Sequence, residues 1–228
     1  MHIPDGYLSP QTYIPLWGGA IAFWSVALKK MKTQLATRQI PYLAMATAFS
    51  FLIMMFNIPI PGGTTGHAVG AGIVALLLGP WTAVIALSVV LIIQALIFGD
   101  GGITAIGANC FNMAIATTFV SYWTFKLIAN PNAGASRLGI AAFCAGYLGL
   151  SVGALLTALE FGIQPLIAQG PDGHPLYAPY PLSVALPAML LEHLLLLSVA
   201  EGLVTALLLR YFLKHEPETI FALARKGR

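Results

Sequence analysis

The first two residues of the chain combine three nitrogen atoms that could bind one metal ion. The chain begins Met1-His2, and His is too large a second residue to permit removal of the initiator methionine, so we expect the α-amine of Met1 to persist. That amine, the backbone nitrogen of His2 and Nδ1 of its imidazole can close two fused chelate rings on one ion. Such planar nitrogen donation favours Ni(II) or Cu(II), whereas Zn(II) prefers tetrahedral nitrogen and sulfur donors and Mg(II) or Ca(II) prefers oxygen.

A fourth nitrogen would complete a square-planar site, and two other histidines are candidates to supply it. His67 lies in the segment 64–70, TTGHAVG, whose small residues permit close approach of another part of the chain. His174 lies in the segment 171–175, PDGHP, which is typical of a solvated loop. We therefore predict Met1, His2 and His67 as the metal ligands. Taken singly, an ordinary terminal histidine and a helix-capping or pore-lining histidine are the simpler interpretations of His2 and His67.

The elements that must position these residues are membrane helices. Of the 228 residues, 58% are hydrophobic and 8% are charged, against roughly a quarter charged in an average soluble domain. The excess apolar surface must face lipid, because exposed to water it would drive aggregation. Runs long enough to span a bilayer occur at about 12–28, 41–58, 80–98, 108–128, 138–159 and 183–212, with a shorter run at about 68–78.

The basic residues decide whether the short run crosses the membrane or is re-entrant. They form three clusters: Lys29, Lys30, Lys32 and Arg38; Lys126 and Arg137; and Arg210, Lys214, Arg225, Lys226 and Arg228. Counting the short run as a crossing places all three clusters on one side, which the positive-inside rule makes cytoplasmic. We therefore predict an all-α bundle of seven transmembrane helices, with the N-terminus outside and the C-terminus cytoplasmic. The clusters form no patch suited to a nucleic acid.

The opposite face is predicted to attract cations. It would be free of Lys and Arg and would collect the following residues: Asp5, Asp100, Glu160, Asp172, His2, His67 and His174. Three segments rich in Gly and Pro, at 57–67, 99–109 and 160–182, fall on the same face. Irregular backbone near a membrane persists where it is packed in protein or lines a cavity. These segments either cap a pocket together or form simple turns.

Polar residues inside the predicted helices have two interpretations each. Glu192, His193 and Glu201 lie in the last run, where ionisable groups are costly and face protein or a cavity. At about 100° per residue, Glu192 and Glu201 would point to opposite sides, so a structural role is favoured over a transport path. Asn109 and Asn112 could orient His67 or Met1, or could cap a loop.

The opening decapeptide MHIPDGYLSP, residues 1–10, resembles the signature of the CbiM/NikM family. The similarity extends to Gly66-His67, to the stretch 107–113 and to Glu201-Gly202. Members are the substrate-binding S components of energy-coupling-factor importers for cobalt and nickel. The resemblance implies seven helices in one transmembrane domain, 1–228, an N-terminal metal-chelating segment, 1–10, tucked in from outside, and ligation by the residues matching Met1, His2 and His67.

The family also implies partners in the plasma membrane of a prokaryote: a transmembrane T component, two ATPase subunits and usually a small accessory membrane subunit. The chain has no G-x-x-x-x-G-K-[ST] pattern, so we expect no ATP hydrolysis by the chain itself and no enzyme activity. An intramembrane hydrolase is disfavoured because the outer histidines lack a paired catalytic partner and no H-E-x-x-H pattern occurs. A self-sufficient secondary nickel permease would place metal-binding His and Asp deep within its helices. Nickel and cobalt both suit the donor set.

Overall fold

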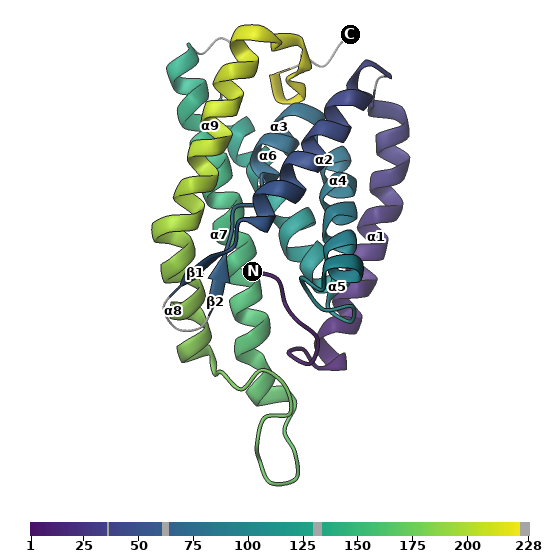
Figure 1. Cartoon of the computed structure of the whole chain (residues 1–228), viewed down its shortest axis with the longest axis vertical. Coiled ribbons are helices and arrows are strands. Elements are labelled where there is room, and N and C mark those ends of the chain that lie inside the picture. The colour runs from purple at the N-terminus through teal and green to yellow at the C-terminus, as the bar shows by residue number, and fades with distance from the viewer. Residues whose placement is uncertain (36, 61–63, 130–133, 224–228) are drawn as a thin grey trace.

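A computed structural model describes residues 1–35, 37–60, 64–129 and 134–223, and helices dominate that part of the chain (Figure 1). Several helices run on into one another through short π-helical stretches, so the described residues form seven rods. In chain order these rods are α1 (Pro10–Gln34); α2 (Ile40–Met55); α3 (Ala71–Leu78); α4 (Pro80–Ile93) with η2 (Gln94–Phe98); α5 (Ile106–Asn109) with η3 (Cys110–Ala116) and α6 (Thr117–Ile128); α7 (Ala135–Ile167); and α8 (Leu182–Glu192) with η4 (His193–Leu197) and α9 (Ser198–His215). The seven rods match the predicted runs.

Three of these helices are long and apolar enough to cross a membrane, at Pro80–Phe98, Ala135–Ile167 and Leu182–His215. A shorter apolar helix covers Ile40–Met55. The bundle therefore fits the predicted membrane class. It departs from a purely helical chain at one hairpin, in which β1 (Ile58–Ile60) pairs antiparallel with β2 (Thr64–Gly66). Residues 61–63, between the two strands in sequence, lie outside the described residues.

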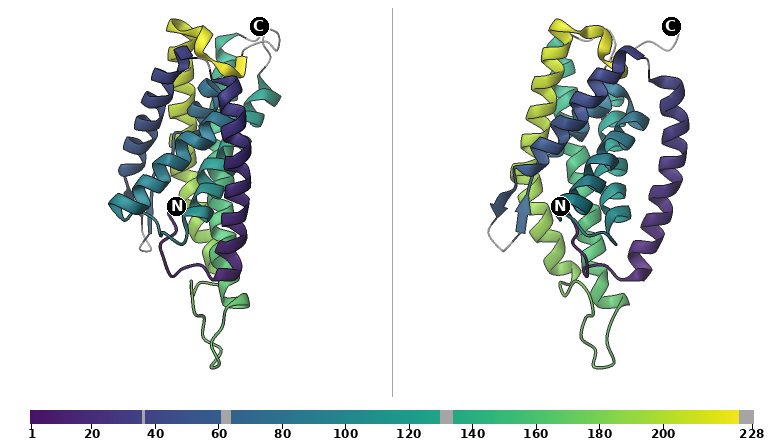
Figure 2. Two further views of the ribbon diagram at one scale, coloured as in Figure 1. Left: turned by 90° about the vertical axis from the view of Figure 1, so that its right-hand side faces the viewer. Right: turned by 45° about the vertical axis from the view of Figure 1, so that its right-hand side comes forward.

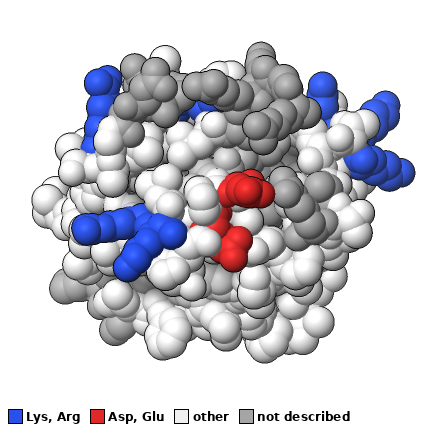
Figure 3. Space-filling model, turned by 90° about the horizontal axis from the view of Figure 1, so that it is seen from above, with Lys and Arg blue, Asp and Glu red and all other residues white. Residues whose placement is uncertain are grey.

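Basic residues gather at one end of the bundle. Figure 3 looks onto the end where the C-terminus lies, and Lys and Arg side chains stand around its rim. The last turns of α1, α6 and α9 contain Lys32, Lys126 and Lys214, so these three helices contribute to the charge at this end of the bundle. The hairpin and the loop 168–181 lie toward the opposite end (Figure 2). Arg225, Lys226 and Arg228 of the predicted third cluster lie outside the described residues.

Helix α3 is short and central. All eight of its residues are buried, and about 12 Å of helix covers less than half of a roughly 30 Å hydrocarbon layer. Glycine permits its close packing, because a Cβ at Gly72 would lie 2.6 Å from Oγ1 of Thr205 in α9 and 3.1 Å from the Cα of Gly146 in α7. The residues that precede α3, including His67, are therefore held inside the bundle.

The N-terminal segment also enters the bundle. From the start of α1 the chain runs back between the helices, so that Met1 lies among them and not at the surface (Figures 1 and 2). Met1 is 6% exposed and packs in a core with Leu87, Met113 and Leu150, contributed by α4, η3 and α7. The predicted tucked-in N-terminus agrees with this course of the chain.

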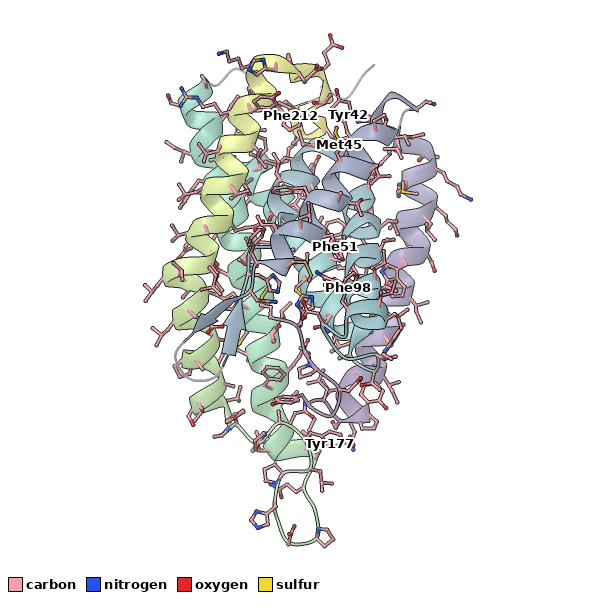
Figure 4. All side chains as sticks on the ribbon, viewed as in Figure 1. Tyr42, Met45, Phe51, Phe98, Tyr177 and Phe212 are labelled. Atoms are coloured by element: carbon pink, nitrogen blue, oxygen red, sulfur yellow. The ribbon has the colours of Figure 1, made fainter. Side chains whose placement is uncertain are left out.

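Aromatic contacts tie α2 to the other helices (Figure 4). Tyr42 contacts Phe212 of α9 with ring centroids 6.4 Å apart, near the basic end. Phe51 contacts Phe98 at the end of η2 with centroids 5.2 Å apart. Helix α2 therefore packs against α9 near one end and against η2 near its other end.

Candidate metal centre

The N-terminal segment is fixed by hydrogen bonds to the side chain of Asn109 and to the backbone of Gly102. The N–H of Ile3 donates to Oδ1 of Asn109 at 2.8 Å, and Nδ2 of Asn109 donates back to the carbonyl of Ile3 at 3.1 Å. The N–H of Gly102 donates to the same carbonyl at 2.8 Å. Because Asn109 is 3% exposed, these bonds are shielded from water. Asn109 therefore holds Ile3, the residue next to His2, and these two hydrogen bonds reach neither His67 nor Met1, which it was predicted to orient.

The loop between η2 and α5 forms the other wall of this enclosure. The carboxylate of Asp5 accepts hydrogen bonds from the N–H groups of Ile103 at 3.0 Å and Thr104 at 2.8 Å. A Cβ on Gly102 would lie 2.3 Å from the backbone nitrogen of Asp5, so only glycine lets the two segments meet. The glycine-rich stretch predicted as a cap does pack against residues 1–5.

His2 and His67 meet inside this enclosure. Nε2 of His67 lies 3.0 Å from Nδ1 of His2, and the ring centroids are 4.8 Å apart. The His2 side chain is 7% exposed and His67 is 1% exposed. The sequence placed both on an outer surface, which is wrong: the two imidazoles are enclosed, because the N-terminal segment and the residues before α3 both lie within the bundle.

Hydrogen bonds on the far sides of the two rings select their tautomers. Nε2 of His2 lies 3.1 Å from Oε1 of Gln94 and donates to it, since an amide oxygen can only accept. Nδ1 of His67 lies 3.0 Å from the carbonyl of Ala68 and donates to it for the same reason. In neutral rings, Nδ1 of His2 and Nε2 of His67 are then both lone-pair acceptors, and they face each other. Two facing acceptors at 3.0 Å repel unless a proton or a cation lies between them.

The electrostatics of the enclosure disfavour the proton. Burial, together with the nearby α-amine, lowers the pKa of His2 from 6.5 to about 4, and Asp100 opposes this shift. Burial likewise holds the pKa of His67 well below 6.5, and the pKa of the Met1 amine is lowered from 8.0, with Glu192 and Asp100 opposing. Desolvation penalises the protonated forms of all three nitrogens. Burial thus favours, in each predicted ligand, the neutral form that can bind a metal.

A residue in the last rod holds the segment that bears His67. The carboxylate of Glu201 accepts hydrogen bonds from the N–H groups of Val69 at 2.8 Å, Gly70 at 2.9 Å and Gly72 at 3.3 Å. A carboxylate at a helix N-terminus satisfies N–H groups that lack partners in the helix. The structural role predicted for Glu201 is the one that these contacts support, and through residues 69–72 it also fixes the backbone next to His67.

Replacing Glu201 with Gln should therefore weaken nickel binding as well as stability. The amide cannot accept three N–H groups, and losing charge-assisted hydrogen bonds in the interior should cost about 2–4 kcal/mol of unfolding free energy. Glu160→Gln is the matched control, because that buried carboxylate accepts from Asn112 at 2.8 Å and contacts no residue of the segment 67–72 by hydrogen bond. Thermal unfolding in detergent and nickel titration should show both variants destabilised and only Glu201→Gln with reduced affinity. Equal nickel affinities would contradict this role.

Three further residues singled out from the sequence make no hydrogen bond to the two imidazoles among the described residues: Asn112, Glu160 and His174. Asn112 donates to Glu160 and to Thr157 at 3.2 Å, so its predicted contact with His67 or Met1 is wrong among the hydrogen bonds of the described residues. Glu160 is 8% exposed and was wrongly assigned to the outer surface. His174 is exposed on the loop 168–181, where its N–H donates to Asp172 at 3.2 Å.

Glu192 and His193 are both buried in the last rod. Nδ1 of His193 lies 2.8 Å from the carbonyl of Met189 and 3.2 Å from Oε1 of Glu192. These contacts remain within the rod and favour the structural interpretation of His193. Glu192 also acts electrostatically on the Met1 amine, so it faces the enclosure.

Sequence reasoning missed Gln94, which is fully buried and orients His2. The sequence did contain a signal for it, since Gln94 is a polar residue within the otherwise apolar run 80–98. The pattern G-x-S-x-G, expected to be absent from the chain, does occur at residues 149–153, GLSVG. Ser151 lies inside helix α7, where its Oγ is 2.7 Å from the carbonyl of Tyr147 and 3.0 Å from Oγ of Ser198, whereas a nucleophile of that kind sits on a tight turn between a strand and a helix.

Comparisons with known proteins address the class of this chain. Residues 2–219 match a family model, CbiM, described as the cobalt uptake substrate-specific transmembrane region. A fused nickel transport protein, NikMN, from Rhodobacter capsulatus is 52% identical over 221 residues, covering 96% of this chain and 64% of that protein. A putative metal transport protein from Methanocaldococcus jannaschii is 45% identical over 219 residues, covering 96% and 94%. The chain thus spans just under two thirds of the Rhodobacter relative.

A solved structure has the same fold. The crystal structure of a truncated transition metal transporter superposes with a TM-score of 0.89 at 46% identity, covering 94% of this chain and 99% of that one. Fold and comparisons together define a helical membrane protein whose relatives are metal transport proteins and not enzymes. The chain belongs to the CbiM family.

Proposed function

We propose that this chain is the substrate-binding membrane subunit of an importer for Ni(II) or Co(II). It captures the ion from outside with four nitrogens: the α-amine of Met1, the backbone nitrogen and Nδ1 of His2, and Nε2 of His67. Three of them belong to the chelating segment 1–10, and the fourth comes from the residues that precede α3. It delivers the ion inward when coupled to a T component, two ATPase subunits and a small accessory membrane subunit in the plasma membrane. The orientation has the basic end in the cytoplasm, which the gathering of Lys and Arg there supports.

The observation that carries this proposal is the pair of facing acceptors, Nδ1 of His2 and Nε2 of His67, at 3.0 Å. In a square-planar complex of the proposed donors, the amine and Nδ1 of His2 flank the His2 amide nitrogen, so His67 occupies the corner opposite the amide and adjacent to Nδ1. Two nitrogens at about 2.0 Å from a metal and at a right angle to each other are about 2.8 Å apart. The observed distance is close to this value, and square-planar nitrogen coordination suits Ni(II).

The His2 amide is available for this purpose. Among the backbone hydrogen bonds of the described residues, none uses the N–H of His2, whereas the N–H of the next residue, Ile3, is bonded to Asn109. Metal binding must displace the amide proton, and a group with no hydrogen bond to lose is the easier one to ionise. The proposed site takes all four donors from two imidazoles and two main-chain nitrogens, so no acidic side chain or cysteine is needed as a ligand.

Proton release on nickel binding tests the proposal. The amide proton leaves on every binding event, so nickel affinity should rise by about tenfold per pH unit between about pH 6 and 8. The low pKa of His2, about 4, means that its imidazole adds to this dependence only at lower pH. Titration calorimetry in buffers of different ionisation enthalpy counts the protons. An affinity that stays flat over this range would reject amide ligation.

A further inference from the structure

The proposed site is enclosed, and one charged residue connects it with water. The His2 side chain is 7% exposed, whereas that of Asp100 is 26% exposed. Oδ1 of Asp100 lies 3.4 Å from Nδ1 of His2, the atom that the proposal assigns to the metal. Glu192, the other carboxylate that acts on the Met1 amine, has a side chain that is only 3% exposed. An ion arriving from solution therefore meets the Asp100 carboxylate before it meets the imidazoles.

The backbone around Asp100 is built to hold this position. Gly99 has φ +67° and Gly101 has φ +97°, so a left-handed residue stands on each side of Asp100. The N–H of Asp100 donates to the carbonyl of Gln94 at 3.0 Å. A Cβ on Gly101 would lie 3.3 Å from Cδ2 of His2, so the glycine lets the loop lie against the ring. Gln94 and Asp100 thus both approach the His2 ring from the segment 94–100, Gln94 at Nε2 and Asp100 at Nδ1.

Other acidic residues at this end of the bundle are engaged elsewhere. The Asp5 carboxylate accepts from two backbone N–H groups of the loop 99–105, and that of Asp172 accepts from the N–H of His174. For Asp100, the described residues offer the His2 ring as the side-chain partner. Its carboxylate is therefore available to an arriving cation.

We propose that Asp100 is the entry ligand, the residue that first binds the metal ion from solution and passes it to His2. Carboxylate oxygen suits a hydrated divalent ion, and it replaces one water molecule when it binds. Nδ1 of His2, within 3.4 Å, then takes the ion, and the carboxylate leaves as the four nitrogens close around it. This inference rests on the proposed function, because it assumes that Nδ1 of His2 is a final ligand. Asp100 acts on the rate of capture and is absent from the final donor set.

Stopped-flow mixing of Ni(II) with the purified chain in detergent tests this role. Asp100→Asn should lower the association rate constant about fivefold or more at low salt and weaken its dependence on ionic strength, because one unit of attraction is lost. The dissociation rate constant should change less than about twofold, and each chain should still take up one ion at saturation. Asp100→Glu keeps the charge and should retain most of the rate. Asp172→Asn, an exposed carboxylate on the loop 168–181, is the matched control and should bind at the wild-type rate.

Each alternative result is distinguishable. An unchanged association rate in Asp100→Asn would overturn the proposal, and so would a change confined to dissociation, which would make Asp100 a final ligand. Equal slowing of association by Asp172→Asn would also overturn it, because the rate would then depend on the overall negative charge of this end and not on a local entry ligand. If Asp100→Asn fails to fold, the salt dependence of Asp100→Glu decides, and a rate as insensitive to salt as that of a neutral site would overturn the proposal. Absence of nickel binding in the wild type would instead reject the proposed function.

Discussion

Adding a single residue before Met1 should abolish high-affinity nickel binding while leaving the fold intact. The added residue turns the α-amine into an amide, which loses its lone pair and with it one chelate ring. The surroundings add a steric reason, since Met1 is 6% exposed and its neighbour Ile3 is fixed by Asn109 and Gly102. We expect a loss of more than about a hundredfold in affinity, because removal of residues that only support a ligand already costs ten- to a hundredfold.

Titration calorimetry on three forms of the chain measures this effect. The forms are the native N-terminus, verified by mass spectrometry to begin with Met1, the same chain with one added glycine, and the native chain acetylated at its amine. Extension by one residue at the C-terminal end is the matched control and should leave affinity unchanged. Equal affinity in the native and the extended forms would exclude the terminal amine as a ligand.

Much of the helical framework could be predicted because lipid imposes a simple pattern. Apolar runs of about 20 residues and the segregation of Lys and Arg are direct consequences of the bilayer, and the observed rods follow the predicted runs. The joint selection of Met1, His2 and His67 followed from donor chemistry. The structure brings the two imidazoles together, as a shared site requires.

The depth of the site could not be predicted in the same way. Charge and loop composition placed His2, His67 and Glu160 at an outer surface, yet all three are largely buried. Depth depends on how far the N-terminal segment enters the bundle, and that is fixed by contacts between residues about 100 positions apart, such as Ile3 with Asn109. A single sequence contains no periodicity that reports such a contact.

The π-helical stretches are a second feature that the sequence could not predict. Counting about 100° per residue along the last run assumed a regular α-helix from Glu192 to Glu201. The stretch His193–Leu197 is π-helical, so each residue there advances by less than the 100° of an α-helix and the count does not hold across it. Gln94 likewise begins a π-helix, η2, and orients His2 from there. Residues at such irregularities make contacts that a regular helical projection could not show.

Replacing His67 with Ala should remove the fourth nitrogen and weaken nickel binding by more than about a hundredfold, whereas His174→Ala should change it less than about twofold. Nε2 of His67 lies 3.0 Å from Nδ1 of His2, but His174 is exposed on the loop 168–181.

Because His67 is 1% exposed, its truncation also leaves a cavity, so thermal unfolding without metal must accompany the titration. His67→Gln, which keeps most of the volume and a polar group, separates the two effects: it should restore stability toward the wild type and still lack an imidazole nitrogen. The absorption spectrum of bound Ni(II) gives an independent measure, because loss of one nitrogen from a square-planar set shifts its visible bands. If His174→Ala instead lost the ion and His67→Ala kept it, the fourth ligand would have to come from the outer loop, which would then fold over the N-terminus when metal binds.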